Sequence, residues 1–427
     1  AHGIAVHRAV VGRRHRERGH QVLRQHAAIG AESVSTFDAD GRVLAQDLMA
    51  ALTVPPADNS AMDGYAVRAA DCAAPGSVLR VTQRIAAGSV GTPVSSGEAA
   101  RIFTGAPIPP GADAVVMQED TQALDADGPQ GAQVRVQQPP APGQWIRRVG
   151  EDVSAGRTVL SRGVRLTPQA LGLAASIGAD RLQVARRPRV ALLSTGDELV
   201  MPGDVPPDAM KPGAIYNSNR FFLRALLLRM GCDVQDLGIV PDRLDATLEV
   251  LRAAAARNDL ILSTGGVSVG EEDHIKPAMQ ALGELQLWSV AIKPGKPFAY
   301  GAIPRAAQEE GEPAFCHVCG LPGNPVSSFV TFLMLVRPFL LAMQGCAALA
   351  PLQVSMRADF DWPRADRRRE FLRARVNAAG GLDLFDNQSS GVLTSTVWSD
   401  GLVDVPANQT LRRGDAVSFL PLSALLA

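Results

Sequence analysis

The chain has 427 residues, of which 46% are apolar and 20% charged, so it is long enough for about three domains with hydrophobic cores. Lysine plus arginine (42) nearly balance aspartate plus glutamate (43). This balance argues against the basic surfaces that bind nucleic acid or anionic membranes, and we expect neither as a partner.

The sequence contains no evident membrane span or secretion signal. The longest apolar run, 329–343, is broken by Arg337 and Pro338, and the first residues lack a signal-peptide pattern. We therefore expect a cytoplasmic protein. Cys316 and Cys319 form a C-x-x-C pair without the second pair of a zinc site, which favours buried thiols.

The first 30 residues are unusually basic. They contain six arginines, five histidines and one glutamate without apolar periodicity. This composition predicts a solvated basic tail, with a binding arm as the alternative. A helix is expected over 40–47, followed by a turn-rich segment that holds Asp63.

Short alternating strands come next. Apolar and polar residues alternate over 78–84, 114–118 and 133–137, between turns rich in proline and glycine. This pattern predicts a small β-rich domain. Thr167 is then expected to cap a helix that closes at Gly178.

Beyond residue 189, predicted strands alternate with predicted helices, which indicates a largely parallel sheet covered by helices. The strands are expected at 190–193, 234–239 and 260–262, and the helices after Asn219 and from Asp245 and Asp273. In such sheets ligands bind beyond the carboxyl ends of the strands.

Three strand ends in this region carry polar loops with glycine, at 194–198, 264–270 and 320–325. A glycine loop that opens a helix binds anions, because its backbone N–H groups are free. The acids at 271–273 would repel a bare phosphate, so we expect a divalent cation between them and the ligand.

Other interpretations of the second loop remain open. Residues 266–270 match the G-x-S-x-G elbow of hydrolases, with His274 nearby, although no acid and distant histidine follow in the expected order. The loop could also be a structural turn. Neither a G-x-G-x-x-G nor a Walker A pattern is present, which argues against an ordinary dinucleotide or P-loop site.

Positive charge is expected beside these loops. Prolines restrict the backbone around Lys293 and Lys296, which would aim both ammonium groups at an anion. From about residue 352, strands and turns predict a separate small β domain. Its arginine-rich run, 364–375, is expected to be a solvated strand face or, alternatively, part of the anion site.

Seven segments together resemble the molybdopterin molybdenumtransferases, the MoeA and gephyrin E-domain family. They are 58–66 (DNSAMDGYA), 104–106 (TGA), 150–152 (GED), 194–198 (STGDE), 264–273 (TGGVSVGEED), 293–297 (KPGKP) and 320–325 (GLPGNP).

The resemblance implies a multidomain α/β plus β fold and a homodimer. The expected parts are a tail (1–30), a linker domain (31–63 and 150–182), an inserted β-rich domain (64–149), an α/β molybdopterin-binding domain with a mainly parallel sheet (183–347) and a C-terminal β-barrel (348–427). The active site is expected between the α/β domain of one subunit and the inserted domain of its partner.

The resemblance implies a transferase of molybdenum cofactor biosynthesis. It would insert molybdenum from molybdate into adenylylated molybdopterin, with magnesium-dependent release of AMP. The residues implied to be catalytic are Asp63, Asp152, Glu198, Asp242, Asp273, Lys293 and Lys296, of which Glu198, Asp242 and Asp273 would hold magnesium. Those implied to bind substrate are Thr104, Thr195, Gly196, Asp197, Gly265, Gly266, Ser268, Gly270, Pro322, Gly323, Asn324, Pro325, Ser327, Arg373 and Ser390.

Alternatives to this function come from the same family. A cofactor-binding scaffold of the gephyrin type would keep the fold without the chemistry, and tungstate could replace molybdate. Ser289 stands where many members have a lysine, which implies lower affinity or rate. The molybdopterin adenylyltransferase and acceptor molybdoenzymes are further implied partners.

Overall fold

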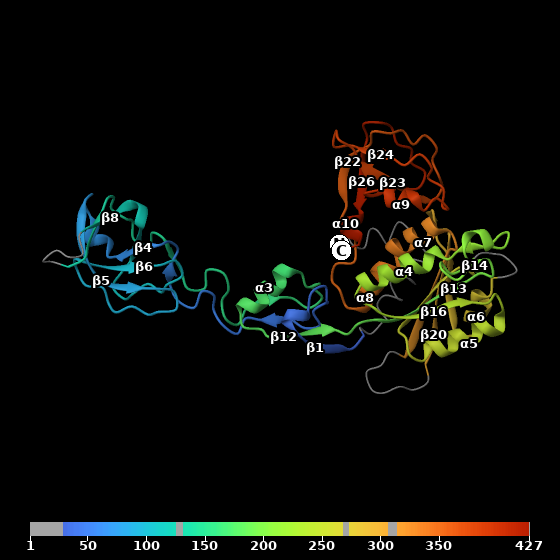
Figure 1. Cartoon of the computed structure of the whole chain (residues 1–427), viewed down its shortest axis with the longest axis horizontal. Helices are drawn as coiled ribbons and strands as arrows, with labels where there is room; N and C mark the ends of the chain where they lie inside the picture. Colours follow the sequence, from blue (N-terminus) through green and yellow to red (C-terminus); the bar gives the residue numbers. More distant parts are fainter. Residues whose placement is uncertain (1–28, 125–130, 268–272, 306–313, 427) are drawn as a thin grey trace.

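The chain, analysed as a computed structural model, is described over residues 29–124, 131–267, 273–305 and 314–426. It is elongated (Figure 1). A β-rich domain lies at one end, and an α/β domain and the C-terminal domain lie at the other, with a linker domain between them. This multidomain organisation confirms the predicted fold class at its coarser level.

The linker domain is built from two separate stretches of chain. β1 (Ala31–Ser35) pairs antiparallel with β12 (Arg181–Ala185), and β2 (Leu48–Met49) with β11 (Thr158–Leu160). The 3₁₀ turn η1 (Thr36–Asp38) and α3 (Pro168–Ser176) complete it. The Thr167 hydroxyl accepts from Ala170 N and Pro168 begins the helix, which confirms the predicted cap.

One prediction for this region is wrong. No helix forms over 40–47, because Leu44 uses its backbone across the domain: it donates to Val164 O at 2.9 Å and accepts from Gly163 N at 2.8 Å. Ile29, at the end of the predicted solvated tail, is buried and donates to Met343 O. The other tail residues, 1–28, lie outside the described part of the chain.

The inserted domain is a six-stranded sheet of order β7-β4-β6-β5-β9-β8. Its strands are β4 (Gly64–Val67), β5 (Ser77–Ile85), β6 (Glu98–Ile102), β7 (Ala114–Met117), β8 (Thr121–Leu124) and β9 (Gln133–Val136), with 3₁₀ turns η2 (Ala69–Cys72) and η3 (Gln118–Asp120). The three predicted strands are confirmed as β5, β7 and β9.

A two-stranded neck joins this domain to the linker. β3 (Asn59–Ser60) pairs antiparallel with β10 (Ile146–Arg147), and a further bridge joins Val54 to Val153. Asp58 accepts from Arg148 Nη1 at 2.6 Å and from Val149 N at 2.8 Å. The chain therefore enters and leaves the inserted domain side by side.

The α/β domain contains a six-stranded sheet of order β16-β13-β17-β21-β20-β18. The first four strands pair in parallel, and β20 and β18 are antiparallel. The strands are β13 (Arg189–Thr195), β16 (Asp233–Val240), β17 (Leu260–Thr264), β18 (Glu284–Ser289), β20 (Pro297–Pro304) and β21 (Phe315–Leu321). Cys316 and Cys319 are buried free thiols within β21, as predicted.

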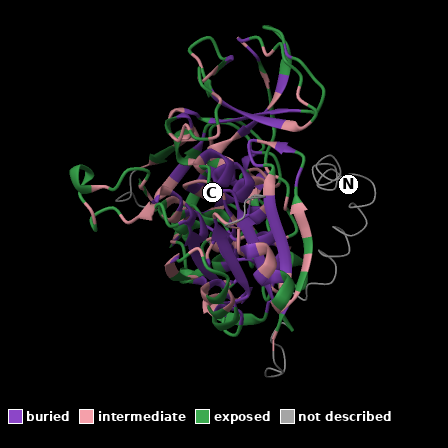
Figure 2. Ribbon diagram, turned by 90° about the vertical axis from the view of Figure 1, so that its right-hand side faces the viewer, coloured by how far each residue is buried: buried purple, intermediate pink, exposed green. Residues whose placement is uncertain are grey.

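Helices cover this sheet, and a ribbon coloured by burial shows its strands enclosed (Figure 2). They are α4 (Ser218–Arg229), α5 (Leu244–Ala255), α6 (Ile275–Leu282), α7 (Pro325–Thr331) and α8 (Arg337–Met343), with a small pair of strands, β14 (Leu199–Val200) and β15 (Ile215–Tyr216), and a 3₁₀ turn η4 (Pro207–Ala209). The predicted strand and helix order is confirmed.

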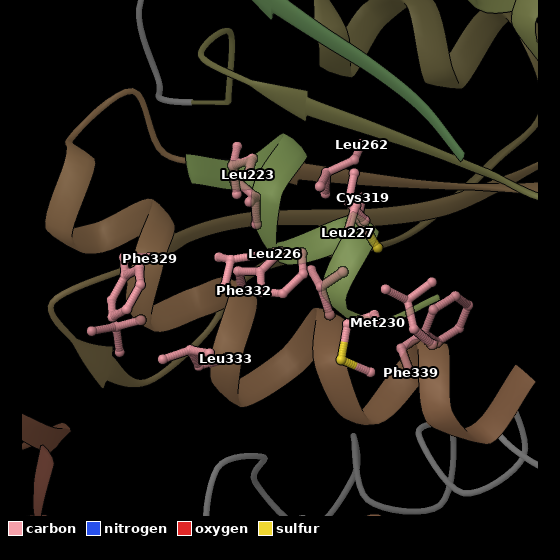
Figure 3. Packing of buried hydrophobic residues seen from close by; sticks show 14 of the residues in the cluster. Leu223, Leu226, Leu227, Met230, Leu262, Cys319, Phe329, Phe332, Leu333 and Phe339 are labelled. Carbon is pink, nitrogen blue, oxygen red and sulfur yellow. The ribbon is translucent and has the colours of Figure 1, made fainter. Parts of the chain in front are cut away.

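The main core lies between α4 and the helical segment 325–343. Leu223, Leu226 and Leu227 of α4 face Phe329, Phe332 and Leu333 (Figure 3). The segment runs through Arg337 and Pro338 without interruption, because the π-helical turn η5 (Phe332–Val336) joins α7 to α8 and Pro338 lies in the first turn of α8. The expectation that no apolar segment reaches transmembrane length is therefore wrong. This segment is long and apolar enough to cross a membrane, but 78% of its most apolar window is buried inside the protein.

Asp259, just before β17, is the centre of a buried ion-pair cluster in the α/β domain. Its buried carboxylate accepts two hydrogen bonds from Arg186 (2.6 and 2.8 Å) and one from Arg189 N (2.8 Å), and Arg305 lies at 3.5 Å. These contacts hold the pKa of Asp259 at about 2 despite its burial.

The C-terminal domain is a third six-stranded sheet, of order β19-β23-β25-β26-β22 with β24 paired to β23. Its strands are β19 (Ile292–Lys293), β22 (Val354–Arg357), β23 (Arg369–Val376), β24 (Leu382–Leu384), β25 (Gly401–Val405) and β26 (Ala416–Pro421), with helices α9 (Thr394–Trp398) and α10 (Leu422–Leu425). β19 comes from the α/β part of the chain and so ties the two domains together. Whether this sheet is a barrel stays a prediction.

Candidate functional site

Three loops meet at the carboxyl ends of β13, β17 and β21. Gly265 N donates to Leu321 O at 3.1 Å, and a side-chain carbon at Gly265 would collide with the carbonyl oxygen of Thr195. Gly266 has a φ of 66°, and a side-chain carbon added there would lie 2.8 Å from Thr195 Oγ1. The glycines are needed here because the loops approach this closely.

A buried polar network holds the second and third loops together. The Asn219 amide donates to Thr264 Oγ1 and to Gly323 O, both at 2.8 Å. Thr264 Oγ1 and Ser328 Oγ both donate to Pro322 O. Asn219 and Ser328 are thus positioning residues that the sequence analysis missed, although both lie in the first turns of helices that follow polar loops.

Alanine at Asn219 is expected to destabilise the protein by about 1–3 kcal/mol, because buried hydroxyl and carbonyl groups would lose their donor. Thermal or urea unfolding measures this loss. Ser328→Ala and the double variant complete a cycle, in which the two losses should not add if both side chains serve one network. Strictly additive losses would show that the two side chains do not serve one network.

Some polar atoms at this edge have no partner among the residues described. Thr195 Oγ1 and Asn217 Nδ2 are buried and make no hydrogen bond within that part of the chain. Buried polar groups are normally paired. Thr195 is one of the predicted substrate-binding residues, and its buried hydroxyl has no hydrogen-bond partner among the described residues.

Acidic side chains gather beside the first loop. Asp197 N donates to Asp242 Oδ2 and Asp242 N to Asp197 Oδ1, both at 3.2 Å. The carboxylate of Glu198 lies against Gly196, and His274 Nε2 is 3.1 Å from Asp242 O. Burial, followed by the charges of Asp197 and Glu198, raises the pKa of Asp242.

These carboxylates fit the chemistry of a magnesium site. Across the described ranges no three His, Cys, Asp or Glu side chains form a ready metal-binding group. Magnesium, however, commonly uses only one or two carboxylates together with substrate phosphates. Asp273 lies just before α6, next to His274.

Ser268 and Gly270 fall outside the described residues. Ser268 is also the serine of the hydrolase alternative.

Lys293 contacts the C-terminal domain directly. Its ammonium lies 2.8 Å from Glu370 and 3.3 Å from Asp366. The hydrogen bond to Glu370 raises the pKa of Lys293. The positive charge of Lys293, which we expected to face an anion, is therefore balanced by these two acids. Lys296, in contrast, is exposed.

The C-terminal domain also reaches the third loop. Val326 N, in the first turn of α7, donates to Ser390 O at 3.0 Å. Pro325 begins α7 after Asn324, and Ser327 is buried within that helix. Arg373 is buried and donates to Ser389 O at 3.3 Å, and its burial lowers the pKa to about 10. It supports the Ser390 segment from within the domain.

Two other arginines of this run are paired with acids. Arg368 pairs with Asp366 at 2.8 Å, and Arg369 pairs with Asp404. Part of the run is therefore ion-paired, whereas Arg364 and Arg367 are exposed.

The last three predicted site residues lie far from these loops. Asp63 Oδ1 accepts from Thr104 N and Thr104 Oγ1, both at 2.8 Å, and these bonds lower the pKa of Asp63. Asp152 is exposed at the neck, where its N–H donates to Val54 O. Asp63 directly precedes β4 and Thr104 follows β6, and the linker domain lies between the domain of these strands and the α/β domain (Figure 1). Within one chain the structure therefore does not bring them to the strand ends.

Glycine loops, unpaired buried polar atoms and clustered carboxylates at one sheet edge define a multidomain α/β protein with a site for a small anionic ligand. Family models match three parts of the chain: the MoeA N-terminal region, domains I and II (residues 14–178), a probable molybdopterin binding domain (191–342) and the MoeA C-terminal region, domain IV (355–422). The chain belongs to the MoeA family of molybdopterin molybdenumtransferases.

Individual relatives agree with this assignment. The molybdopterin molybdenumtransferase of Haemophilus influenzae is 37% identical, over 92% of this chain and 95% of its own. Molybdopterin molybdenumtransferase 2 of Mycobacterium tuberculosis H37Rv is 37% identical over 88% and 90%. The crystal structure of the molybdopterin biosynthesis MoeA protein from Pyrococcus horikoshii OT3 aligns with a TM-score of 0.80 and 30% identity, covering 95% of this chain and 98% of that one.

Proposed function

We propose that this protein inserts molybdenum from molybdate into adenylylated molybdopterin, with magnesium-dependent release of AMP. The observation that carries the proposal is the meeting of glycine loops and clustered carboxylates at one sheet edge. The loops suit a phosphorylated ligand and the acids suit a cation, and cleavage of a phosphoanhydride needs both.

Each group of residues has a role in this proposal. Thr195, Gly265 and Gly266 bind the phosphate and nucleotide, together with the other glycine-loop residues predicted above. Glu198, Asp242 and Asp273 hold magnesium, which when bound neutralises negative charge on the phosphoanhydride. Lys296, Ser327 and Ser390 bind molybdate, because they lie near the contact of the α/β and C-terminal domains.

A homodimer completes the site. Asp63 and Thr104 flank β4 and β6 of the inserted domain, which the linker domain separates from the α/β domain of the same chain (Figure 1). They would therefore reach strand-end loops only from a second copy. We therefore propose that the inserted domain of each subunit, with Asp152 at its neck, closes the site of its partner. The protein would act in the cytoplasm, between the molybdopterin adenylyltransferase and acceptor molybdoenzymes, and its C-terminal domain would form a barrel.

AMP release tests the reaction directly. The purified protein is incubated with adenylylated molybdopterin and magnesium, with and without molybdate, beside Asp273→Ala. We expect molybdate-stimulated AMP release that the variant abolishes. Tight binding of the adenylylated compound with no AMP formed would reject the enzyme and support a gephyrin-type scaffold.

Mixing two strongly impaired variants tests the shared site. A dimer of one Asp63→Ala and one Asp273→Ala chain contains one intact site and one doubly altered site. Random 1:1 pairing should therefore restore about one quarter of wild-type activity. Size-exclusion chromatography checks that mixed dimers form. Mixed dimers without restored activity would show that both acids act from the same chain.

A further inference from the structure

One guanidinium contacts both sides of the Asp63–Thr104 pair. Arg101, in β6, donates through Nη1 to Gly64 O at 2.8 Å, directly after Asp63. Its guanidinium carbon lies 4.8 Å from the ring centroid of Phe103, directly before Thr104. Arg101 is therefore linked to the acid and to its hydrogen-bond donor through their chain neighbours.

Further contacts fix the position of this guanidinium. Nη2 donates to Gln118 Oε1 at 2.7 Å, and Gln118 N donates to Asp63 O at 3.0 Å. The ring of Tyr65, which is paired with Arg101 in register, lies 5.2 Å away. Arg101 thus connects β4, β6 and the start of η3 around Asp63, and its charge also lowers the pKa of that acid.

The surroundings leave the pair little freedom. Gly64 is so close to β7 that a side-chain carbon there would collide with Val116 O. On the other side, Arg84 of β5 stacks on Phe103 at 4.4 Å, because a register shift after Val81 brings Arg84 beside Arg101. A cation held over aromatic rings by two directed hydrogen bonds has a defined orientation.

We infer that Arg101 is a positioning residue for the reaction: it holds Asp63 and Thr104 in the geometry needed to close the partner's site. The inference rests on the proposed function, in which Asp63 acts in the site. Arg101 acts through the acid and its donor rather than on the substrate.

Steady-state AMP release by Arg101→Ala tests this role. We expect kcat to fall by about 10- to 100-fold, because a small displacement of a reacting group has that effect. KM should change less than about twofold, since ground-state binding is retained. Arg101→Lys should remain slow, because a single ammonium cannot donate as a fork while stacking. Arg84→Ala, which removes the other cation on Phe103, is the matched control and should stay near the wild-type rate.

A double-variant cycle separates positioning from folding. In an Asp63→Ala background, Arg101→Ala should reduce kcat no further, because its effect runs through that acid. An equal loss with and without Asp63, or a wild-type rate for Arg101→Ala, would overturn the inference. A loss of thermal stability that accounts for the lower rate would overturn it too. Failure of the wild-type protein to release AMP would instead reject the proposed function.

Discussion

Asparagine in place of Asp242 is expected to reduce molybdate-dependent AMP release by about 10²- to 10³-fold, the range found when one group that stabilises transition-state charge is removed. Asp242 exchanges backbone-to-carboxylate hydrogen bonds with Asp197 and lies near Glu198. An amide has nearly the same shape but cannot neutralise a cation. Initial rates measured over a range of magnesium concentrations should show a higher magnesium requirement.

The same change should stabilise the magnesium-free protein. Because burial and neighbouring acids disfavour the Asp242 carboxylate, its removal relieves repulsion in the folded state. We therefore expect a higher melting temperature together with a lower rate. Asp245→Asn, three residues away at an exposed ion pair with Arg243, is the matched control and should change neither. A destabilised Asp242→Asn protein would show that this acid serves the fold instead.

Alanine in place of Asp259 is expected to have the largest effect on stability, about 3–5 kcal/mol, the range for removal of one partner from a buried ion pair. The change would leave Arg186, Arg189 and Arg305 without the carboxylate that they share. Urea unfolding followed by circular dichroism measures the loss. Asp245→Ala, at an exposed pair, should lose less than about 1 kcal/mol.

Lowering the pH should reproduce part of this loss of stability. The folded pKa of Asp259, about 2, lies below its ordinary value of 3.8, so the carboxylate stabilises the fold above that ordinary value. Its contribution falls as the pH drops from 3.8 towards 2, and the wild type and Asp259→Ala should converge there. A constant difference in stability across this window would contradict the assignment.

Local patterns predicted much of this fold. The alternation of strands and helices beyond residue 189 and the Thr167 cap depend on neighbours in sequence, and both were found. The helix expected over 40–47 failed because Leu44 pairs with residues 163 and 164, more than 100 positions away. Local sequence preferences do not predict pairing between residues that are so far apart in the chain.

The loops of the site were predictable from the sequence, whereas the contacts that hold them in place were less so. Glycines at strand ends pointed to the edge where Thr195, Gly265 and Gly323 meet. The bond from Asn219 to Gly323 joins residues far apart in sequence, as does the ion pair of Lys293 with Glu370. Such partners are set by tertiary packing, and a residue's type alone did not reveal them.

The two-stranded neck has a mechanical consequence. A domain tethered by a single chain crossing can swivel about one bond, whereas this one is held by paired strands, a bridge from Val54 to Val153 and the Asp58–Arg148 ion pair. Any swing of the inserted domain must bend both crossings at once. Asp63 follows one crossing and Asp152 lies on the other, so the two acids would approach or leave a neighbouring subunit in a single coupled movement.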